Sequence, residues 1–232
     1  MELTESIILG AKTIWGKGIT LRPMFSDAEQ SSVFLVRRNQ IEVGVLKIHS
    51  HADSARREIH AYTRWWPAFS KWATRYLGHL PDNPHMLCFE YAKGQRPNDT
   101  SDVEPWRHAG CMLQALHQFQ VEDHDPIDVR RAFQLRFEAL TALGESHLGA
   151  RKWAWAREFG IPGAPVCRVA CHRDYRPRNW LYTPVEKRFI VLDFGQSRLD
   201  DPLTDLITLW PILRVGDMRA DAFFQGYGKH LE

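Results

Sequence analysis

The strongest constraint on the fold is a pair of polar stretches that flank two short apolar runs late in the chain. The first stretch, HRDYRPRNW, covers residues 172–180, and the second, FIVLDFGQS, covers residues 189–197. Between them, TPVEKR carries a proline and charged residues, which are typical of a turn. The sequence therefore predicts a β-hairpin with Asn179 at the open end of one strand and Asp193 at the open end of the other.

This hairpin is expected to place two oxygen ligands side by side. If its turn is centred on Glu186, Asn179 and Asp193 oppose each other, and opposed residues of an antiparallel pair have Cα atoms about 4.5–5.5 Å apart. Amide and carboxylate oxygens at that spacing suit one Mg²⁺ ion, which prefers few protein ligands plus phosphate oxygens. Asp174 lies on the loop that enters the same end, where it is free to face a substrate hydroxyl.

The arrangement is the one that phosphoryl transfer requires. The reaction needs positioned groups, a metal ion that neutralises charge and a carboxylate that accepts the hydroxyl proton. The pattern H-x-D-x-x-x-x-N followed by D-F-G also resembles the signature of kinases. Both patterns occur in the right order and each at a strand end, so they predict a catalytic Asp174 and the metal ligands Asn179 and Asp193.

The first part of the chain supplies a lysine and a glutamate for the nucleotide. Lys47 stands in the apolar run VGVLKIHS, and a lysine among apolar neighbours is costly unless it is paired. Glu58 lies on the next predicted helix and is the expected partner, whereas Glu42 is a poorer candidate because it shares the strand of Lys47. A lysine held in this way can bind the phosphates of a nucleotide.

These motifs, together with DPLTDL at residues 201–206 and LQALHQF at residues 113–119, resemble the aminoglycoside phosphotransferase and choline kinase family, small-molecule relatives of protein kinases. The resemblance covers nearly the whole chain. It implies an α+β, two-lobed protein-kinase-like fold with a β-rich nucleotide-binding N-lobe, residues 1–91, and a mostly helical catalytic C-lobe, residues 92–232. It also implies ATP or GTP as the donor, Mg²⁺ as the metal and a small-molecule hydroxyl as the acceptor.

The resemblance also suggests where the nucleotide is held. Its base is expected against the linker around Phe89–Tyr91, with Glu90 and Tyr91 as contacts. No G-x-G-x-x-G pattern is present, so the stretch FSDAEQSSVF is expected to cover the phosphates through backbone N–H groups and through Ser31 or Ser32. The interval from Lys47 to Glu58 is short for the family, which requires a tight connection.

Several residues near the motifs are expected to support the site. In relatives, a histidine such as His172 braces the catalytic loop, and Asp205 is expected to hold the same loop through backbone N–H groups. Three arginines, Arg173, Arg176 and Arg178, are expected either to bind an acidic substrate or the transferred phosphate, or to lie on the surface.

Hydrophobic periodicity predicts the remaining elements. SSVFLVRR and EVGVLKIHS read as a hairpin around the turn NQ, HMLCFEYAKG reads as a further strand, and Asp53 or Ser54 is expected to cap the helix that contains Glu58. Apolar residues with helical spacing predict helices in four later stretches: EPWRHAGCMLQALHQFQ, VRRAFQLRFEALTAL, ARKWAWAREFG and the tail.

Composition excludes other classes. The net charge of +2 argues against a nucleic-acid binder, and no apolar run approaches the length of a membrane span. Acidic residues precede the first apolar run, so the N-terminus is not expected to be a signal peptide and the protein is expected in the cytoplasm. No pair of the four cysteines has C-x-x-C spacing, so they are expected to be reduced thiols.

The acceptor is the least constrained part of the prediction. By resemblance, an antibiotic such as an aminoglycoside is the first expectation, and the acidic loop VEDHDPID either lines a pocket for it or is solvated. Choline, sugars and amino-alcohols are alternatives. A protein kinase is disfavoured because too few residues follow Gly195, and a nucleotide-binding pseudokinase because the Lys, Asp, Asn and Asp set is intact.

Overall fold

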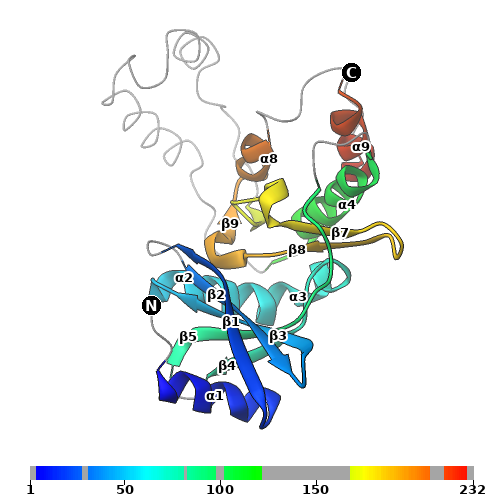
Figure 1. Cartoon of the computed structure of the whole chain (residues 1–232). Coiled ribbons are helices and arrows are strands. Elements are labelled where there is room, and N and C mark those ends of the chain that lie inside the picture. Colours follow the sequence, from blue (N-terminus) through cyan, green and yellow to red (C-terminus); the bar gives the residue numbers. More distant parts are fainter. Residues whose placement is uncertain are drawn as a thin grey trace, which may run out of the picture.

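The computed structural model describes residues 4–27, 31–80, 83–97, 102–121, 168–209 and 217–228. Its first part is a five-stranded antiparallel sheet in the order β1-β2-β3-β5-β4, with helix α1 on the outer face (Figure 1). The elements are α1 (Glu5–Trp15), β1 (Ile19–Asp27), β2 (Ser31–Arg38), β3 (Ile41–His49), β4 (Tyr76–Leu80) and β5 (Asn83–Glu90).

The two faces of the sheet pack into two cores because side chains alternate along a strand. Leu46 and Ile48 of β3 face α1, in a cluster with Ile7, Ala11 and Trp15. Leu87 and Phe89 of β5 point to the other face and join the larger core. Lys47 lies between Leu46 and Ile48, so its side chain is directed away from α1 and toward that second face.

The hairpin predicted around Asn39 and Gln40 is present. Both residues have positive φ, 51° and 66°, as a two-residue turn whose twist matches the strands requires. The register pairs Leu35 with Val45 and Val33 with Lys47, which places Lys47 near the middle of the sheet.

The helix after β3 begins earlier than predicted. Helix α2 (Ala52–His60) has His51 as its N-cap, so Asp53 and Ser54 lie in the first turn and neither caps it. The physical reason is that β3 continues to His49 and leaves two residues for the connection, so the helix starts at once. The chain then passes through η1 (Ala61–Trp65), α3 (Trp66–Phe69) and η2 (Ser70–Trp72) on the inner face of the sheet.

The second part is built on two packed helices, α4 (Glu104–Gln118) and α9 (Met218–Tyr227). Short strand pairs lie between this helix pair and the sheet (Figure 1). The elements are β6 (Val169–Cys171), η3 (Pro177–Asn179), β7 (Trp180–Thr183), β8 (Arg188–Val191), η4 (Phe194–Gln196), β9 (Arg198–Asp200) and α8 (Leu203–Leu209). The helices predicted in VRRAFQLRFEALTAL and ARKWAWAREFG, the acidic loop VEDHDPID and Cys167 lie outside the described residues.

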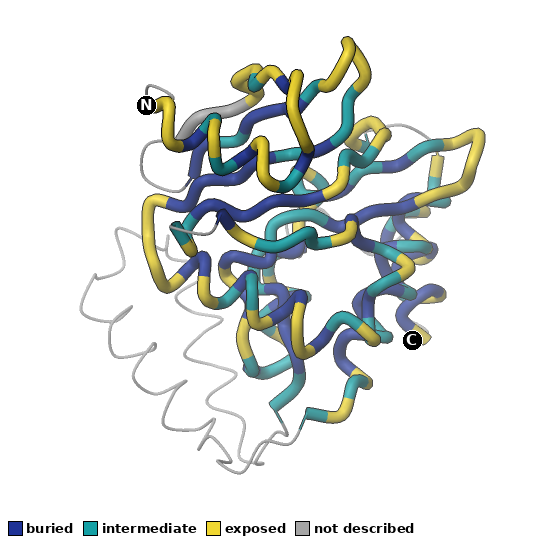
Figure 2. The backbone as a smooth tube through the Cα atoms, turned by 90° about the horizontal axis from the view of Figure 1, so that it is seen from below, coloured by how far each residue is buried: buried dark blue, intermediate teal, exposed yellow. Residues whose placement is uncertain are grey.

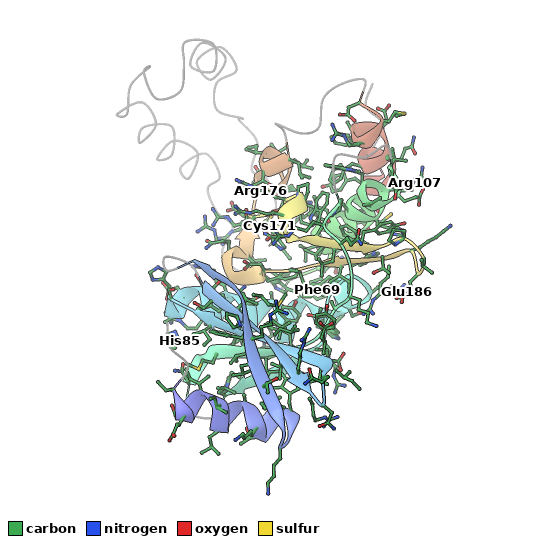
Figure 3. The ribbon with its side chains drawn as sticks, viewed as in Figure 1. Phe69, His85, Arg107, Cys171, Arg176 and Glu186 are labelled. Carbon is green, nitrogen blue, oxygen red and sulfur yellow. The ribbon has the colours of Figure 1, made fainter. Side chains whose placement is uncertain are left out.

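The predicted β7–β8 hairpin is present, but its register differs by one residue. Trp180 pairs with Val191 and Thr183 with Arg188, so the turn holds four residues, 184–187. Leu192 rather than Asp193 therefore stands opposite Asn179, and the Leu192 N–H donates to the Asn179 carbonyl at 2.8 Å. A turn with an even number of residues cannot be centred on Glu186, which lies at the hairpin tip (Figure 3).

One aromatic cluster joins the sheet to the helical part. Phe194 stacks on Phe69 with ring centroids 4.4 Å apart, and Tyr62 and His172 contact the same Phe194 ring. Figure 2 shows the buried backbone running along the central strands, with exposed residues at the hairpin tips. In the described part of the chain no helix is long and apolar enough to cross a bilayer.

The described cysteines are free thiols, as predicted. Cys88 and Cys171 are buried, and Cys111 is half-buried. Burial raises the pKa of Cys88 to about 12, which keeps that thiol protonated and unreactive.

Candidate active site

An ion-pair cluster, in which Lys47 and Glu58 are buried and Asp193 is 37% exposed, connects three elements of the chain. Lys47 Nζ lies 2.7 Å from Glu58 Oε2 and 2.7 Å from Asp193 Oδ1. The ion pair predicted between Lys47 and Glu58 is thus present. Glu42 instead pairs with Arg37, at 3.0 Å. The two carboxylates balance the charge of Lys47 and so offset the cost of placing a lysine in an apolar strand.

The charges of this cluster shift one another's ionisation. Burial alone would raise the pKa of Asp193, but the Lys47 ammonium beside it prevails and lowers that pKa to about 2. Burial likewise opposes ionisation of Lys47 and of Glu58. Their mutual attraction still raises the pKa of Lys47 and lowers the pKa of Glu58. All three groups are therefore ionised at neutral pH.

His49 also belongs to this cluster, although it was not predicted from the sequence. Its Nε2 lies 2.6 Å from Glu58 Oε2, and the side chain is buried. The signal was present in the pattern Lys-x-His, because residues i and i+2 of a strand lie on the same face. Glu58 is thus held by two side chains of one strand.

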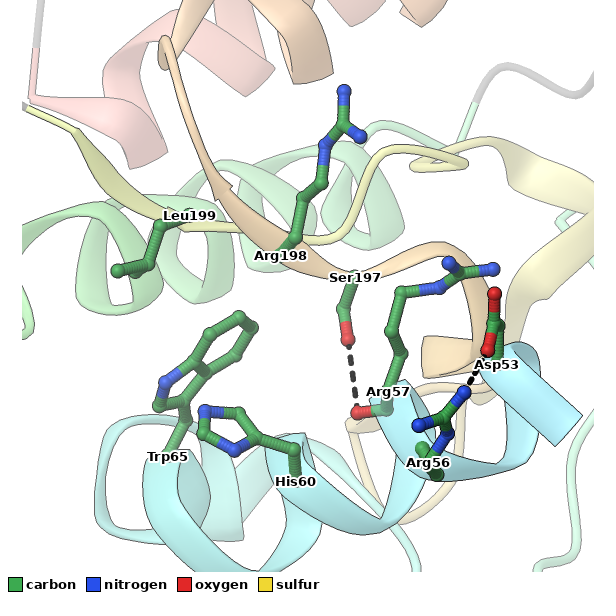
Figure 4. Close-up of a pocket in the computed structure, with 8 residues that line it drawn as sticks. All are labelled: Asp53, Arg56, Arg57, His60, Trp65, Ser197, Arg198 and Leu199. Carbon is green, nitrogen blue, oxygen red and sulfur yellow. Dashed lines mark hydrogen bonds and ion pairs between the residues drawn. The ribbon is translucent and has the colours of Figure 1, made fainter. Parts of the chain in front are cut away.

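Helix α2 is bonded to the segment after Asp193. Glu58 Oε1 accepts from the Phe194 N–H at 3.2 Å, and Arg57 Nε donates to the Gly195 carbonyl at 2.9 Å. Ser197 Oγ donates to the Arg57 carbonyl at 3.4 Å. Figure 4 shows the outer side of this contact, where α2 and β9 border a hollow of about 470 Å³.

Asp193 reaches Lys47 because its backbone turns at that point. Its φ of 66° is in the left-handed region, and its Oδ1 accepts from the Gly195 N–H at 3.2 Å. An aspartate tolerates this conformation better than most residues, since its short side chain bonds to the local backbone.

Asp174 is surrounded by hydrogen-bond donors. Asn179 Nδ2 donates at 2.9 Å both to the Asp174 carbonyl and to its Oδ2. Arg178 Nη2 lies 2.7 Å from Oδ2, and Arg176 Nε lies 3.3 Å from Oδ1. The Asp174 side chain is 16% exposed, so a small part of it remains open to solvent.

His172 and Asp205 hold the loop that carries Asp174 through hydrogen bonds, as predicted. His172 Nε2 lies 2.9 Å from the Leu192 carbonyl. Asp205 is fully buried and accepts from the backbone N–H groups of His172 and Arg173. His117 lies 3.0 Å from the same Asp205 carboxylate, through Nε2.

The two predicted metal ligands do not contact each other. Asn179 bonds to Asp174, and Asp193 bonds to Lys47. Their other side-chain oxygens, Asn179 Oδ1 and Asp193 Oδ2, make no hydrogen bond within the described part of the chain. Both are hard donors near the open end of the β7–β8 hairpin, so this donor set fits Mg²⁺ once phosphate oxygens complete the shell.

A second group of side chains has residue types that could bind a metal, but hydrogen bonds account for their positions. His117, Cys171 and Asp205 have ligand atoms within 4.8 Å of one another, and all three residues are buried. His117 bonds to Asp205 and to the Tyr227 hydroxyl, and the Cys171 thiol donates to backbone carbonyls. Burial raises the Cys171 pKa, which disfavours the thiolate that a metal needs.

The predicted nucleotide contacts lie at the ends of two inner strands of the sheet, β2 and β5. Ser31 and Ser32 are buried at the start of β2, where Ser31 pairs with His49 in the ladder. Glu90 ends β5, and its side chain lies 3.6 Å from Arg75. Tyr91 follows it, and burial, assisted by a hydrogen bond to Glu42, raises the pKa of its hydroxyl.

The sequence pattern of one family matches most of the chain. The phosphotransferase enzyme family, APH, matches residues 20–232. The chain belongs to this family. Membership confirms the predicted class of enzyme, a phosphotransferase with kinase-like relatives. No curated protein matches the chain in sequence.

Solved structures share the fold at low identity. An aminoglycoside phosphotransferase, APH(2")-IIa, in a streptomycin–ATP ternary complex has a TM-score of 0.69 and 17% identity, over 98% of this chain and 83% of that one. A macrolide 2'-phosphotransferase, MphH from Brachybacterium faecium, has a TM-score of 0.68 and 19% identity, over 95% of this chain and 81% of that one. A choline/ethanolamine kinase family protein from Mesorhizobium loti has a TM-score of 0.69 and 19% identity, over 97% of this chain and 76% of that one. The α+β, protein-kinase-like fold is thereby confirmed.

The Asp193–Lys47 contact predicts how stability depends on pH. The pKa of Asp193 falls from 3.8 to about 2 on folding, so its charge stabilises the protein above the unfolded pKa, and this contribution is lost as the pH falls toward the folded pKa. Urea unfolding of the wild type and of Asp193→Asn should show a constant difference in free energy near neutral pH. That difference should shrink below about pH 4; a constant difference throughout would contradict the assigned contact.

Proposed function

We propose that the protein is an ATP-dependent O-phosphotransferase that phosphorylates a hydroxyl group of a small molecule. Lys47, steadied by Glu58 and His49, holds phosphate oxygens of the nucleotide. Asn179 and Asp193 hold Mg²⁺, which when bound neutralises charge on the transferring phosphoryl group. Asp174 orients the acceptor hydroxyl and accepts its proton.

The observation that carries this proposal is the bonded set around Asp193. Lys47 from β3, Glu58 from α2 and Asp193 from the segment after β8 come together in one cluster, although 146 residues separate Lys47 from Asp193. A single structural ion pair needs one carboxylate. A second carboxylate that keeps one oxygen available is what a site for metal and phosphate requires.

The nucleotide is proposed to bind between an N-lobe of residues 1–91 and a C-lobe of residues 92–232. Its base lies against Glu90 and Tyr91, and Ser31 or Ser32 approaches the phosphates. ATP is the proposed donor and GTP the alternative. Neighbours with ATP and with GDP bound support a nucleotide site in this fold.

The acceptor is proposed from the neighbours and from the family. Antibiotic phosphotransferases, including those for aminoglycosides, support a hydroxylated antibiotic and hence a role in resistance. The choline/ethanolamine kinase family protein supports a smaller alcohol instead. Choline, a sugar or an amino-alcohol is therefore the second candidate acceptor.

A product screen tests the proposal. Purified protein, ATP and Mg²⁺ are incubated with aminoglycosides, macrolides, choline, sugars and a generic protein substrate, and products are read by mass spectrometry. We expect a gain of one phosphoryl group on a small molecule, abolished by EDTA and restored by excess Mg²⁺. Phosphorylation of the protein substrate alone, or ATP binding without any transfer, would favour a protein kinase or a pseudokinase.

A further inference from the structure

Arg57 bonds helix α2 to the segment after β8 in two ways. Its side-chain Nε donates to the Gly195 carbonyl at 2.9 Å. Its own backbone carbonyl accepts from Ser197 Oγ at 3.4 Å, the contact that Figure 4 marks between these two residues. Two residues of the segment that begins with Asp193 are therefore held by a single residue of the helix.

The guanidinium of Arg57 is used for neutral acceptors. Its Nη2 donates to Ser54 Oγ at 3.2 Å, and the carboxylate one turn earlier, Asp53, pairs with Arg56. Within the described residues Arg57 has no carboxylate partner. A half-buried guanidinium is costly unless its hydrogen bonds are made, and the bond to Gly195 is the shortest that Arg57 makes. The role of Arg57 is therefore sought in what Gly195 does.

Gly195 connects Arg57 to the carboxylate of Asp193. The Gly195 N–H donates to Asp193 Oδ1 at 3.2 Å, and Lys47 Nζ lies 2.7 Å from the same oxygen. Gly195 also has little free space around it, because a methyl group there would lie 3.0 Å from His49 Cε1. A residue that holds the Gly195 carbonyl therefore also limits where its N–H can point.

The two donors on Oδ1 determine the direction of the other carboxylate oxygen. A carboxylate is planar, so Asp193 Oδ2 is directed once Oδ1 is held, and Oδ2 is the oxygen proposed above for Mg²⁺. The backbone of Asp193 has a φ of 66°, a left-handed conformation that is unfavourable for a residue with a Cβ atom. Contacts from outside the segment are needed to keep it there.

We infer that Arg57 is a positioning residue for the metal ion, and that its Nε–H, by holding the Gly195 carbonyl, keeps Asp193 Oδ2 directed at the metal position. The inference rests on the proposed function. Arg57 acts through Gly195 and is not itself a ligand. Groups that orient a metal ligand commonly change metal affinity when they are removed, although they do not touch the metal.

This role gives two neighbouring residues of α2 complementary tasks. Glu58 holds Lys47 through Oε2 and accepts from the Phe194 N–H through Oε1. Arg57 holds the next residue, Gly195, by its carbonyl. The helix thus positions both the lysine proposed for the phosphates and the aspartate proposed for the metal.

Two substitutions separate the hydrogen bond of Arg57 from its charge. Glutamine Nε2 lies the same number of bonds from the backbone as arginine Nε, so Arg57→Gln keeps a donor there and removes the charge. Arg57→Met places a methyl group at that position and keeps an unbranched side chain. Arg56→Met is the matched control, because Arg56 is the preceding residue of the same helix and its side chain is 76% exposed.

The metal site is measured through nucleotide binding, without an acceptor. Calorimetric titration with ADP, once with Mg²⁺ and once with EDTA, gives the factor by which the metal strengthens binding. Loss of folded protein lowers the binding stoichiometry but leaves this factor unchanged. Arg57→Met should reduce the factor about tenfold, or to one where the wild-type factor is smaller, as expected for a group that orients a metal ligand. Its affinity for ADP in EDTA should equal that of the wild type.

The other variants decide between explanations. Arg57→Gln should retain most of the factor, since a neutral donor still bonds to the carbonyl, and Arg56→Met should retain all of it. An unchanged factor in Arg57→Met, or equal losses in Arg57→Gln and Arg57→Met, would overturn the inference. If Arg57→Met does not fold, Ser197→Ala, which removes the longer bond, decides alone: a smaller loss supports the inference and no loss overturns it.

The wild type separates this inference from the function on which it rests. A wild-type factor of one would refute the proposed metal site and the role of Arg57 together. A wild-type factor well above one that persists in Arg57→Met would refute only the role of Arg57 and leave the proposed phosphotransferase site intact.

Discussion

Replacing Asp174 by asparagine is expected to lower the turnover number by about 10²- to 10⁴-fold, the usual contribution of a positioned general base. Asparagine keeps the size of the side chain and an oxygen that can accept from Asn179 Nδ2, so the loop should retain its shape. An amide does not accept the proton of the acceptor hydroxyl. Affinity for the nucleotide should stay within about twofold, because Lys47 and Asp193 are unchanged.

The measurement combines a steady-state assay of product formation with a separate titration of ATP binding. Asp53→Asn is the matched control, because Asp53 is 65% exposed on α2 and pairs with Arg56. Its turnover should equal that of the wild type. If Asp174→Asn binds ATP more weakly by tenfold or turns over normally, Asp174 is not the base.

Replacing Gly226 by alanine is expected to destabilise the protein by about 3 kcal/mol, near the upper end of the range for overpacking. Helices α4 and α9 cross at two glycines, and a methyl group on Gly226 would collide with the Arg107 carbonyl oxygen. A methyl group on Gly110 would collide with the Phe223 carbonyl oxygen in the same way. Backbone atoms on both sides cannot rotate away, so the helices must separate.

Thermal unfolding measures this effect. At about 2–4 °C per kcal/mol for a domain of this size, Gly226→Ala should lower Tm by roughly 6–12 °C. Gly10→Ala is the matched control, because Gly10 is also helical but its added methyl would meet the side chain of Leu80, nearest at Cδ1, rather than backbone. Its Tm should stay within about 3 °C of the wild type, since alanine favours a helix by up to about 1 kcal/mol. Equal shifts for the two variants would show that the crossing is not tightly packed.

The helix crossing also bears on the active site. His117 of α4 and Tyr227 of α9 bond to each other at 2.7 Å, and His117 bonds to the Asp205 that holds the loop of Asp174. The substitution at Gly226 lies one residue before Tyr227. A loss of turnover in Gly226→Ala at temperatures where it remains folded is therefore expected, through displacement of this support.

Local patterns were sufficient for strands β2, β3, β5, β7 and β8, for several helices and for choosing the residues of the proposed site. Lys47 in an apolar strand needed a carboxylate, and the following helix offered Glu58. The strand-end positions of Asn179 and Asp193 followed from apolar runs and turn residues. Each of these inferences depends on neighbours within about one supersecondary unit, which sequence periodicity describes well.

Two predicted details were wrong because each depends on where a neighbouring strand begins or ends. The register of the β7–β8 hairpin depended on whether its turn holds an odd or an even number of residues, and composition does not specify that number. The start of α2 depended on how far β3 extends. The hairpin error is one residue and the helix error two or three, yet the first changes which residue stands opposite Asn179.

The amino-acid sequence by itself determined the family, the fold class and the Lys47, Glu58, Asp174, Asn179 and Asp193 set. Only the tertiary structure decided how these side chains are bonded: Asp193 to Lys47, Asn179 to Asp174, and His49 as a second donor to Glu58. It also decided that Arg176 and Arg178 converge on the base while Arg173 turns to Asp200. The physical reason is that hydrogen bonds depend on side-chain direction and on contacts between distant segments, and neither can be read from the order of residues along one strand or loop.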